Sequence, residues 1–231
     1  VLVGTSGFSY KEWKGSFYPD DLSDKQMLAY YATKLQTVEI NASFYRLPMP
    51  KVVAEWAARV PEGFVFVLKA PQRITHQLRL KDTQEVLARF VEVSESLGDK
   101  RGPFLFQLPP FFKKDAPRLA DFLATLPANG IRAAFEFRHD SWFSDDVYEV
   151  LKARDAALCC ADTEKGATPL EATASWGYLR LRDADYAEGE LAAWKERIVA
   201  QPWSDAFVYM KHEDEGKGAK MAMMLRGMLG G

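Results

Sequence analysis

The chain alternates between short apolar segments and longer segments whose apolar residues have the spacing of amphipathic helices. Strands that alternate with helices pair in parallel, because each parallel neighbour is reached through a long crossover. Eight such units in 231 residues match a closed (β/α)₈ TIM barrel, which typically takes ~250 residues. The expected strands lie within residues 1–7, 37–41, 64–69, 103–110, 132–142, 156–162, 178–182 and 206–212.

Helical spacing of apolar residues, capping residues and chain breakers predict which segments between these strands form helices. A doubly wound open sheet is the alternative fold, but no G-x-G-x-x-G or P-loop motif follows any expected strand. No repeat or linker interrupts the pattern, so residues 1–231 are expected to form a single barrel domain. Gly166 and Pro169 break segment 163–174, which predicts a degenerate helix after the sixth strand. Helices are expected at 24–34, 51–59, 83–97, 115–126, from Ser144, at 188–200 and at 216–229.

Composition restricts the location and the class of partner. A formal charge of −2 gives no support for a uniformly basic nucleic-acid coat, although a local patch is compatible with it. No charged-apolar leader is present, and no apolar run approaches the ~18 residues of a membrane span. Cys159 and Cys160 are adjacent in an apolar run, where a bridge would need distorted geometry. They indicate reduced core residues of a cytoplasmic protein without a membrane partner.

Active sites of TIM barrels lie at the carboxyl ends of the strands, so polar residues there are the candidate site. The stretch 132–142 is a buried strand that ends in ionisable residues; alternation puts Glu136 and Arg138 on one face and Phe137 and His139 on the other. The same design recurs at other strand exits, whose middles are apolar. The collected residues are Thr5, Ser6, Glu39, Asn41, Lys69, His76, Gln107, Glu136, Arg138, His139, Asp162, Arg180, Arg182, Lys211 and His212.

Cations outnumber acids in this set, which predicts a small anionic ligand, phosphate-bearing or a nucleotide. The planar fork of arginine donates two parallel hydrogen bonds to such groups. Gly216 and Gly218, at the start of the last helix, would suit a phosphate, although residues 213–215 are acidic. Candidates for proton transfer are Glu39, Lys69, His76 and Glu136. The expected ligand-binding residues are Asn41, Gln107, Arg138, His139, Asp162, Arg180, Arg182 and Lys211.

Other readings of the same residues stay open. A network of self-satisfied ion pairs would explain the charges without a ligand. A metal-dependent hydrolase or isomerase could use Glu39, Glu136, Asp162 and His212, but no local ligand spacing supports it, and we expect no metal and no cofactor. A non-catalytic nucleic-acid-binding module is weaker because the net charge is near zero. It would stack bases on aromatic residues, for which loop packing is the preferred reading: Phe8, Tyr10, Trp13, Phe17, Tyr18, Phe44, Tyr45 and Trp142.

Several linked motifs resemble the YecE-like family, a group of unknown function. They lie at residues 4–10, 13–19, 38–48, 69–76, 106–110 and 136–142, and the likeness runs from the first strand to the last. The resemblance implies a TIM-barrel fold and bacterial or archaeal proteins without an established activity. Many members have an aromatic-Asn-Asn-Asp pattern at the eighth strand, where this chain has Met-Lys-His-Glu-Asp at 210–214. The motif positions fall at Glu39, Asn41, Lys69, His76, Gln107, Glu136, Arg138, His139 and Asp162.

Overall fold

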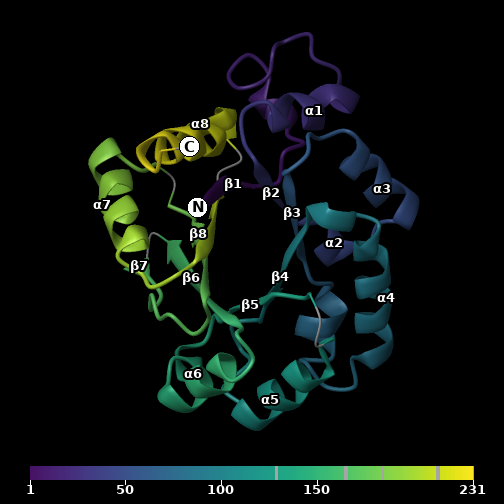
Figure 1. The fold of residues 1–231 in the computed structure, drawn as a ribbon, viewed down its shortest axis with the longest axis vertical. Coiled ribbons are helices and arrows are strands. Elements are labelled where there is room, and N and C mark those ends of the chain that lie inside the picture. Colours follow the sequence, from purple (N-terminus) through teal and green to yellow (C-terminus); the bar gives the residue numbers. More distant parts are fainter. Residues whose placement is uncertain (128–129, 164–165, 184, 212–213, 231) are drawn as a thin grey trace.

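A closed ring of parallel strands forms the centre of the protein (Figure 1). The computed structural model describes residues 1–231 except 128–129, 164–165, 184, 212–213 and 231. Within the described residues the ring runs β1-β2-β3-β4-β5-β6-β8-β9 and closes because β9 pairs with β1. Closure rules out the open-sheet alternative. The ring strands are β1 (Leu2–Ser6), β2 (Thr37–Ile40), β3 (Val65–Lys69), β4 (Arg101–Gln107), β5 (Ala133–Glu136), β6 (Ala157–Thr163), β8 (Trp176–Leu181) and β9 (Asp205–Met210).

Helices surround the ring on its outer side (Figure 1). Local sequence sets where several begin: Pro50 is the first residue of α3, and Asp115 caps α5 by accepting a hydrogen bond of 3.1 Å from the Arg118 amide. None of the described helices is long and apolar enough to cross a membrane. The helices are α1 (Met27–Ala32), α2 (Ala42–Tyr45), α3 (Pro50–Ala58), α4 (Gln84–Glu95), α5 (Ala116–Thr125), α6 (Asp145–Lys152), α7 (Glu188–Val199) and α8 (Lys217–Met228).

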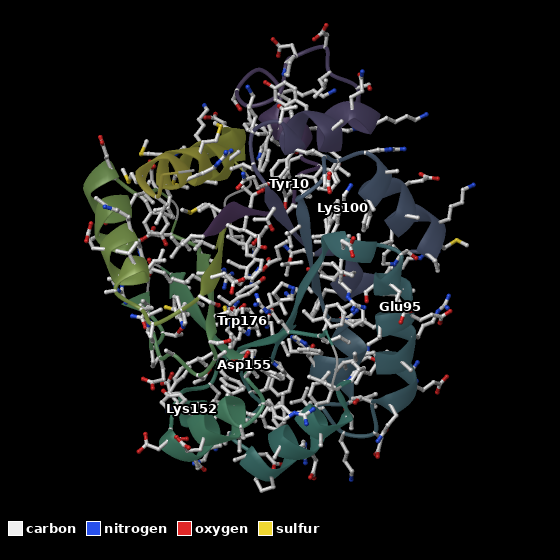
Figure 2. All side chains as sticks on the ribbon, in the orientation of Figure 1. Tyr10, Glu95, Lys100, Lys152, Asp155 and Trp176 are labelled. Atoms are coloured by element: carbon white, nitrogen blue, oxygen red, sulfur yellow. The ribbon has the colours of Figure 1, made fainter. Side chains whose placement is uncertain are left out.

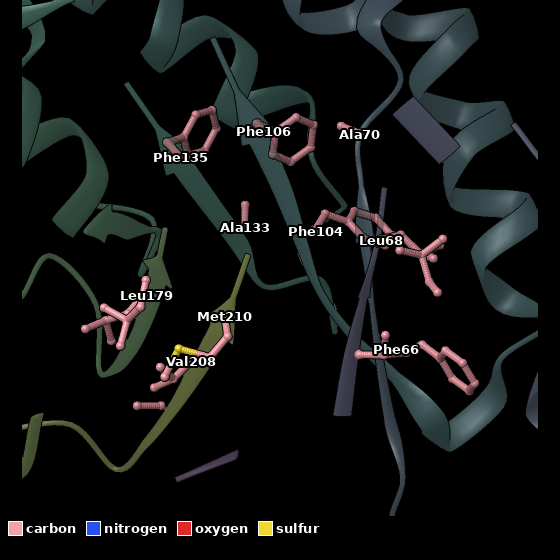
Figure 3. Packing of buried hydrophobic residues seen from close by; sticks show 14 of the residues in the cluster. Phe66, Leu68, Ala70, Phe104, Phe106, Ala133, Phe135, Leu179, Val208 and Met210 are labelled. Atoms are coloured by element: carbon pink, nitrogen blue, oxygen red, sulfur yellow. The ribbon is translucent and has the colours of Figure 1, made fainter. Parts of the chain in front are cut away.

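Side-chain alternation along each strand divides the core into two layers. Outward-facing residues such as Phe104, Phe135 and Leu179 pack between the ring and the helices (Figure 3). Inward-facing residues such as Val67, Tyr178 and Tyr209 fill the barrel interior as a second cluster. Trp176 belongs to that interior, whereas Glu95 and Lys152 lie on the outer helices (Figure 2). The barrel is therefore a packed core, and only its ends are open to a ligand.

The segments between strands differ from expectation in three places. The described part of the β6–β8 connection contains the short strand β7 (Gly166–Ala167), antiparallel to the end of β6, and no helix. Residues 42–45, which follow the expected second strand and for which no helix was predicted, form helix α2. The polar segment after β3 contains a π-helical turn, Arg73–Gln77. Helix α2 and the π-helical turn each follow the carboxyl end of a strand, so they shape the rim of the barrel.

Candidate functional site

The carboxyl ends of the strands surround a pocket of about 400 Å³ at one mouth of the barrel. The ends of β3, β4 and β8 supply part of its wall, and the segments that follow β1, β2, β3, β5, β8 and β9 supply the rest. The described lining residues are Tyr10, Asn41, Ala42, Phe44, Tyr45, Lys69, His76, Gln107, Arg138, Arg180, Arg182 and Lys211. Eight of the twelve predicted site residues thus come together here: Asn41, Lys69, His76, Gln107, Arg138, Arg180, Arg182 and Lys211.

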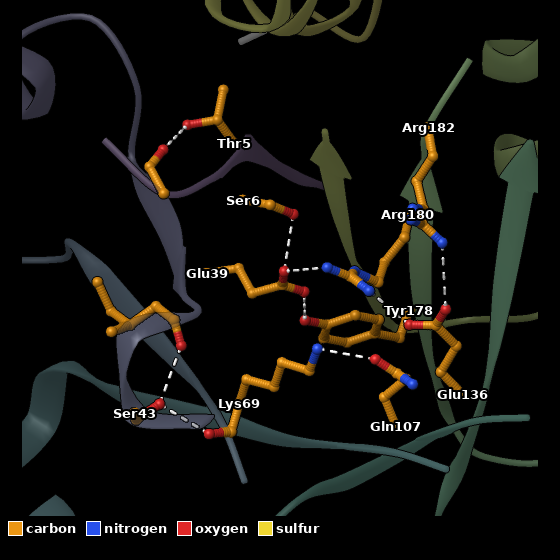
Figure 4. A network of polar contacts seen from close by, with 12 residues as sticks. Thr5, Ser6, Glu39, Ser43, Lys69, Gln107, Glu136, Tyr178, Arg180 and Arg182 are labelled. Carbon is orange, nitrogen blue, oxygen red and sulfur yellow. Dashed lines mark hydrogen bonds and ion pairs between the residues drawn. The ribbon is translucent and has the colours of Figure 1, made fainter. Parts of the chain in front are cut away.

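Arg180 lies at the floor of this pocket and joins two buried carboxylates (Figure 4). Its Nη2 donates to Glu39 Oε1 at 2.8 Å, and its Nη1 donates to Glu136 Oε2 at 2.6 Å. All three side chains are at most 2% exposed. Because these charges are removed from water, their mutual pairing is what makes their burial tolerable.

Glu39 is fully engaged by its surroundings (Figure 4). Besides Arg180, Ser6 Oγ donates to its Oε1 at 2.7 Å, and the Tyr178 hydroxyl donates to its Oε2 at 2.6 Å. Burial and the nearby Glu39 carboxylate raise the pKa of Tyr178 well above its ordinary value, so the phenol remains a donor. Tyr178 was missed in the sequence, although it precedes Arg180 by two residues and alternation places both on the same face of β8.

Glu136 is surrounded by three arginines. Arg138 Nη2 lies 2.5 Å from Glu136 Oε1, and Arg182 Nη1 lies 3.8 Å from the same oxygen. Both contacts are ion pairs that lack hydrogen-bond alignment. Burial alone raises the pKa of Glu136, but the guanidinium groups of Arg180, Arg138 and Arg182 outweigh it and hold the pKa at about 2. Glu136 therefore remains ionised at every physiological pH, which suits a fixed counter-charge better than a proton acceptor.

Lys69 projects from the end of β3 into the same pocket. Its Nζ donates to Gln107 Oε1 at 2.8 Å and lies 4.2 Å from the centroid of the Phe44 ring. Burial, followed by the positive charge of Arg180, lowers the pKa of Lys69 to about 8 against the opposing effect of Glu136 and Glu39. The amine is therefore partly neutral at physiological pH, which an exposed lysine is not.

His76 is positioned in the pocket by the π-helical turn after β3. Its Nδ1 lies 2.8 Å from Thr75 Oγ1, and its ring packs edge-on against Phe44 with centroids 5.0 Å apart. Burial, then the charges of Lys69 and Arg138, lower its pKa. A neutral imidazole at neutral pH follows.

His139 and Asp162 lie elsewhere. His139 Nδ1 accepts a hydrogen bond of 3.1 Å from the Ser141 amide and caps the short turn Asp140–Trp142. Asp162 Oδ2 accepts from the Tyr186 hydroxyl at 2.7 Å and from the Trp194 indole at 3.2 Å. The structure therefore separates both residues from the described pocket lining. His139 follows the outward-facing Phe137 by two residues, and Asp162 follows the outward-facing Cys160 by two residues. Because side chains alternate along an extended chain, both are directed away from the barrel interior, which accounts for the separation.

Aromatic residues predicted at the rim divide into two groups. Trp13, Phe17, Tyr18 and Trp142 are buried, and Phe8 is half-buried against the core, which agrees with loop packing. Tyr10 and Phe44 line the pocket, and Tyr45 lines it while remaining 75% exposed. A large exposed aromatic side chain thus lies at the edge of a cationic pocket, where it could cover a ligand.

No group of three or more His, Cys, Asp or Glu side chains suited to a metal ion is found within the part of the chain that the structure describes. His212, one of the proposed metal ligands, lies outside the described residues, as does Glu213. Gly216 and Gly218 do not contribute to the described lining of the pocket. A Cβ at Gly216 would lie 2.8 Å from Ser16 Oγ and 3.0 Å from Phe17 Cβ, so this glycine permits close packing of the first loop.

Fold and site together define a TIM-like barrel with a cationic pocket at the carboxyl ends of its strands. Residues 2–231 match the family described as "Protein of unknown function DUF72", and the chain belongs to that family. This confirms the YecE-like resemblance predicted from the motifs.

Curated relatives include the UPF0759 protein YecE of Escherichia coli, 32% identical over 49% of this chain and 42% of the relative. The UPF0759 protein YunF of Bacillus subtilis is 30% identical over 64% of this chain and 54% of the relative. The matched stretches therefore span about half the length of these relatives.

Solved structures of the family have the same fold. A DUF72 family protein from Thermotoga maritima superposes with a TM-score of 0.87 at 28% identity, covering 100% of this chain and 99% of its own. A DUF72 family protein from Enterococcus faecalis superposes with a TM-score of 0.81 at 20% identity, covering 99% and 95%, and shows the fold alone.

Proposed function

We propose that the protein is an enzyme that binds an anionic small molecule, phosphate-bearing or a nucleotide, in the pocket at the barrel mouth. The observation that carries this proposal is the charge imbalance of the site. Five cationic side chains line the described pocket, namely Lys69, Arg138, Arg180, Arg182 and Lys211. Among the described residues, the carboxylates that pair with its three arginines are Glu39 and Glu136, which lie below the pocket. A bound anion would neutralise the excess.

Unmatched donors support the same proposal. The Nε groups of Arg138, Arg180 and Arg182 are buried and have no hydrogen-bond partner among the described residues. Buried donors without partners are rare, because each one costs free energy. An anion that entered the pocket would supply acceptor oxygens to this arginine cluster.

The proposal assigns different roles to the predicted residues. Arg138, Arg182 and Lys211 bind the anion, and Arg180 is held in place for it by Glu39 and Glu136. Lys69 is the group that transfers a proton near neutral pH, with His76 beside it, while Asn41 and Gln107 contribute neutral polar contacts. His139 and Asp162 take no part, because their side chains are engaged elsewhere. In this proposal residues 1–231 act as one barrel domain, and the buried Cys159 and Cys160, which form no disulfide, suit a cytoplasmic location.

Thermal denaturation in the presence of anions tests the proposal. A panel of inorganic phosphate, sugar phosphates and nucleotides should contain a compound that raises the Tm of the wild type by roughly 5 °C at a hundredfold excess over its Kd. The double variant Arg138→Gln, Arg182→Gln should lose that increase. Arg59→Gln is the matched control, because Arg59 follows α3 outside the described pocket lining and makes only exposed contacts among the described residues, 3.6 Å to Glu55 and 3.5 Å to the Lys25 carbonyl oxygen. A wild type whose Tm no anion changes would contradict the proposal.

A further inference from the structure

Among the described lysines, Lys69 is the one that the fold buries, at 9% exposed. Lys69 Nζ has one neutral acceptor, Gln107 Oε1, and the face of one aromatic ring, Phe44. No carboxylate pairs with it among the residues that the structure describes. Lys100 shows the contrast: its Nζ donates to the carbonyl oxygens of Ala57 at 2.6 Å and Val60 at 2.8 Å, which fixes the chain around it.

These contacts leave the Lys69 amine inside the pocket and without a direct carboxylate partner among the described residues. A carboxylate partner would hold the proton on the amine, whereas an amide oxygen and an aromatic ring hold it much less strongly. Burial and the neighbouring cations Arg180 and Lys211 disfavour the charged form, and together they outweigh the opposing charges of Glu136 and Glu39, which lie nearby without pairing with the amine. Activated lysine nucleophiles in enzymes arise in this way, by desolvation or beside another cation.

We propose that Lys69 is a nucleophile that forms an imine with the carbonyl group of an anionic aldehyde or ketone bound in the pocket. This inference rests on the proposed function, because the arginines must first bind the anionic part of the substrate. The substrate class then narrows to molecules that carry a phosphate or carboxylate together with a reactive carbonyl group.

The chemistry balances without any redox partner. The lone pair of the neutral Lys69 amine forms a C–N bond while the C=O π pair moves to oxygen, which gives a carbinolamine after proton transfer from nitrogen to oxygen. The hydroxyl group then takes a second proton and leaves as water, and the nitrogen lone pair forms the C=N bond. The sum is amine, carbonyl compound and one proton giving a protonated imine and water. Hydrolysis regenerates the amine.

The acid–base properties of the site agree with this step. With a pKa of about 8, about one Lys69 amine in ten is neutral at pH 7, against about one in three thousand for an ordinary lysine. The protonated imine keeps the positive charge of the lysine, so the charge balance of the pocket is unchanged. At 400 Å³ the pocket is in the range of small-molecule sites.

Reductive trapping tests the inference. The protein is incubated with pyridoxal 5′-phosphate, or with the smaller carbonyl acid glyoxylate, together with cyanoborohydride, and labelled peptides are mapped by mass spectrometry. We expect the peptide that contains Lys69 to be labelled at least about tenfold faster than exposed lysines at pH 7, because its neutral fraction is about 300 times larger and the lower nucleophilicity of a less basic amine offsets only part of that advantage. Its labelling rate should level off above pH 8, whereas exposed lysines should continue to gain reactivity to about pH 10.

Variants separate this inference from the proposed function. Lys69→Arg keeps the positive charge and should abolish the label while retaining the anion-dependent increase in Tm; Lys100→Arg should label at the wild-type rate. If Lys69→Arg does not fold, the wild-type peptide map and its pH profile decide. Stabilisation by phosphate without preferential labelling of Lys69 would overturn the inference alone. Absence of both would overturn the proposed function as well.

Discussion

At the scale of single residues, the site depends on how two glutamates hold one arginine. Glu39 lies in β2 and Glu136 in β5, three strands apart in the ring, and each accepts a hydrogen bond from one Nη group of Arg180. A guanidinium held by two carboxylates has few accessible rotamers, so its free Nε edge stays in place without a ligand. The cost is that removal of either carboxylate leaves a buried cation without a partner.

Replacement of Glu136 should produce a stability defect that depends on pH. The folded-state pKa of about 2 lies below the ordinary value of 4.5, so the ion pairs contribute fully above pH 4.5 and are lost as pH falls toward 2. Glu136→Gln should lower the free energy of unfolding by roughly 3 kcal/mol at pH 7. The difference in the free energy of unfolding between this variant and the wild type should shrink between pH 4.5 and pH 2.5, because the wild-type carboxyl group then takes up a proton.

Urea denaturation across this pH range measures the effect. Glu92→Gln is the control, since Glu92 is 61% exposed and pairs only with Arg89 on the same helix. A stability difference between Glu136→Gln and wild type that stays constant from pH 7 to pH 2.5 would show that the Glu136 charge is not what stabilises the fold.

At the scale of elements, the sequence predicts the strands and most helices because their periodicities are local. Alternation also separates Arg180 and Arg182, which line the pocket, from Leu181, which packs outward. The pairing of Glu39 with Arg180 is not predictable in this way, because 141 residues separate them and only ring closure brings them together. Helix α2 and the π-helical turn were missed as well, since each is too short for its periodicity to be recognised.

The close approach of two strands near the site gives a prediction at this scale. A Cβ at Gly4 of β1 would lie 2.1 Å from the carbonyl oxygen of Thr37 in β2, and a backbone atom of a paired strand cannot move aside. Gly4→Ala should therefore destabilise the protein by about 2 kcal/mol or more. Gly189→Ala in α7 meets nothing within 4 Å and should be neutral or stabilising by up to ~1 kcal/mol. Equal urea midpoints for both variants would contradict the close approach.

At the scale of the whole molecule, charge is distributed unevenly. The chain has 30 Lys and Arg against 32 Asp and Glu, yet the described lining of the mouth contains five cations. Cationic side chains from several strand ends thus gather around one pocket, although the chain as a whole has slightly more acids than bases. This distribution distinguishes a small anion, which the pocket can surround, from a nucleic acid, which must contact several phosphates in a row.

Salt dependence of binding should therefore be shallow. A nucleic acid releases condensed counterions, so log K falls against log salt with a slope of about −0.7 to −0.9 for each phosphate contacted. A small anion carries no such atmosphere, and its affinity should fall less than about tenfold between 50 and 200 mM salt. Titration calorimetry with the best anion of the panel and with a 20-nucleotide strand compares the two cases. Tight binding of the strand with a slope steeper than about −4 would favour a nucleic-acid-binding module, since that slope requires at least five phosphate contacts and one pocket of this size cannot supply them.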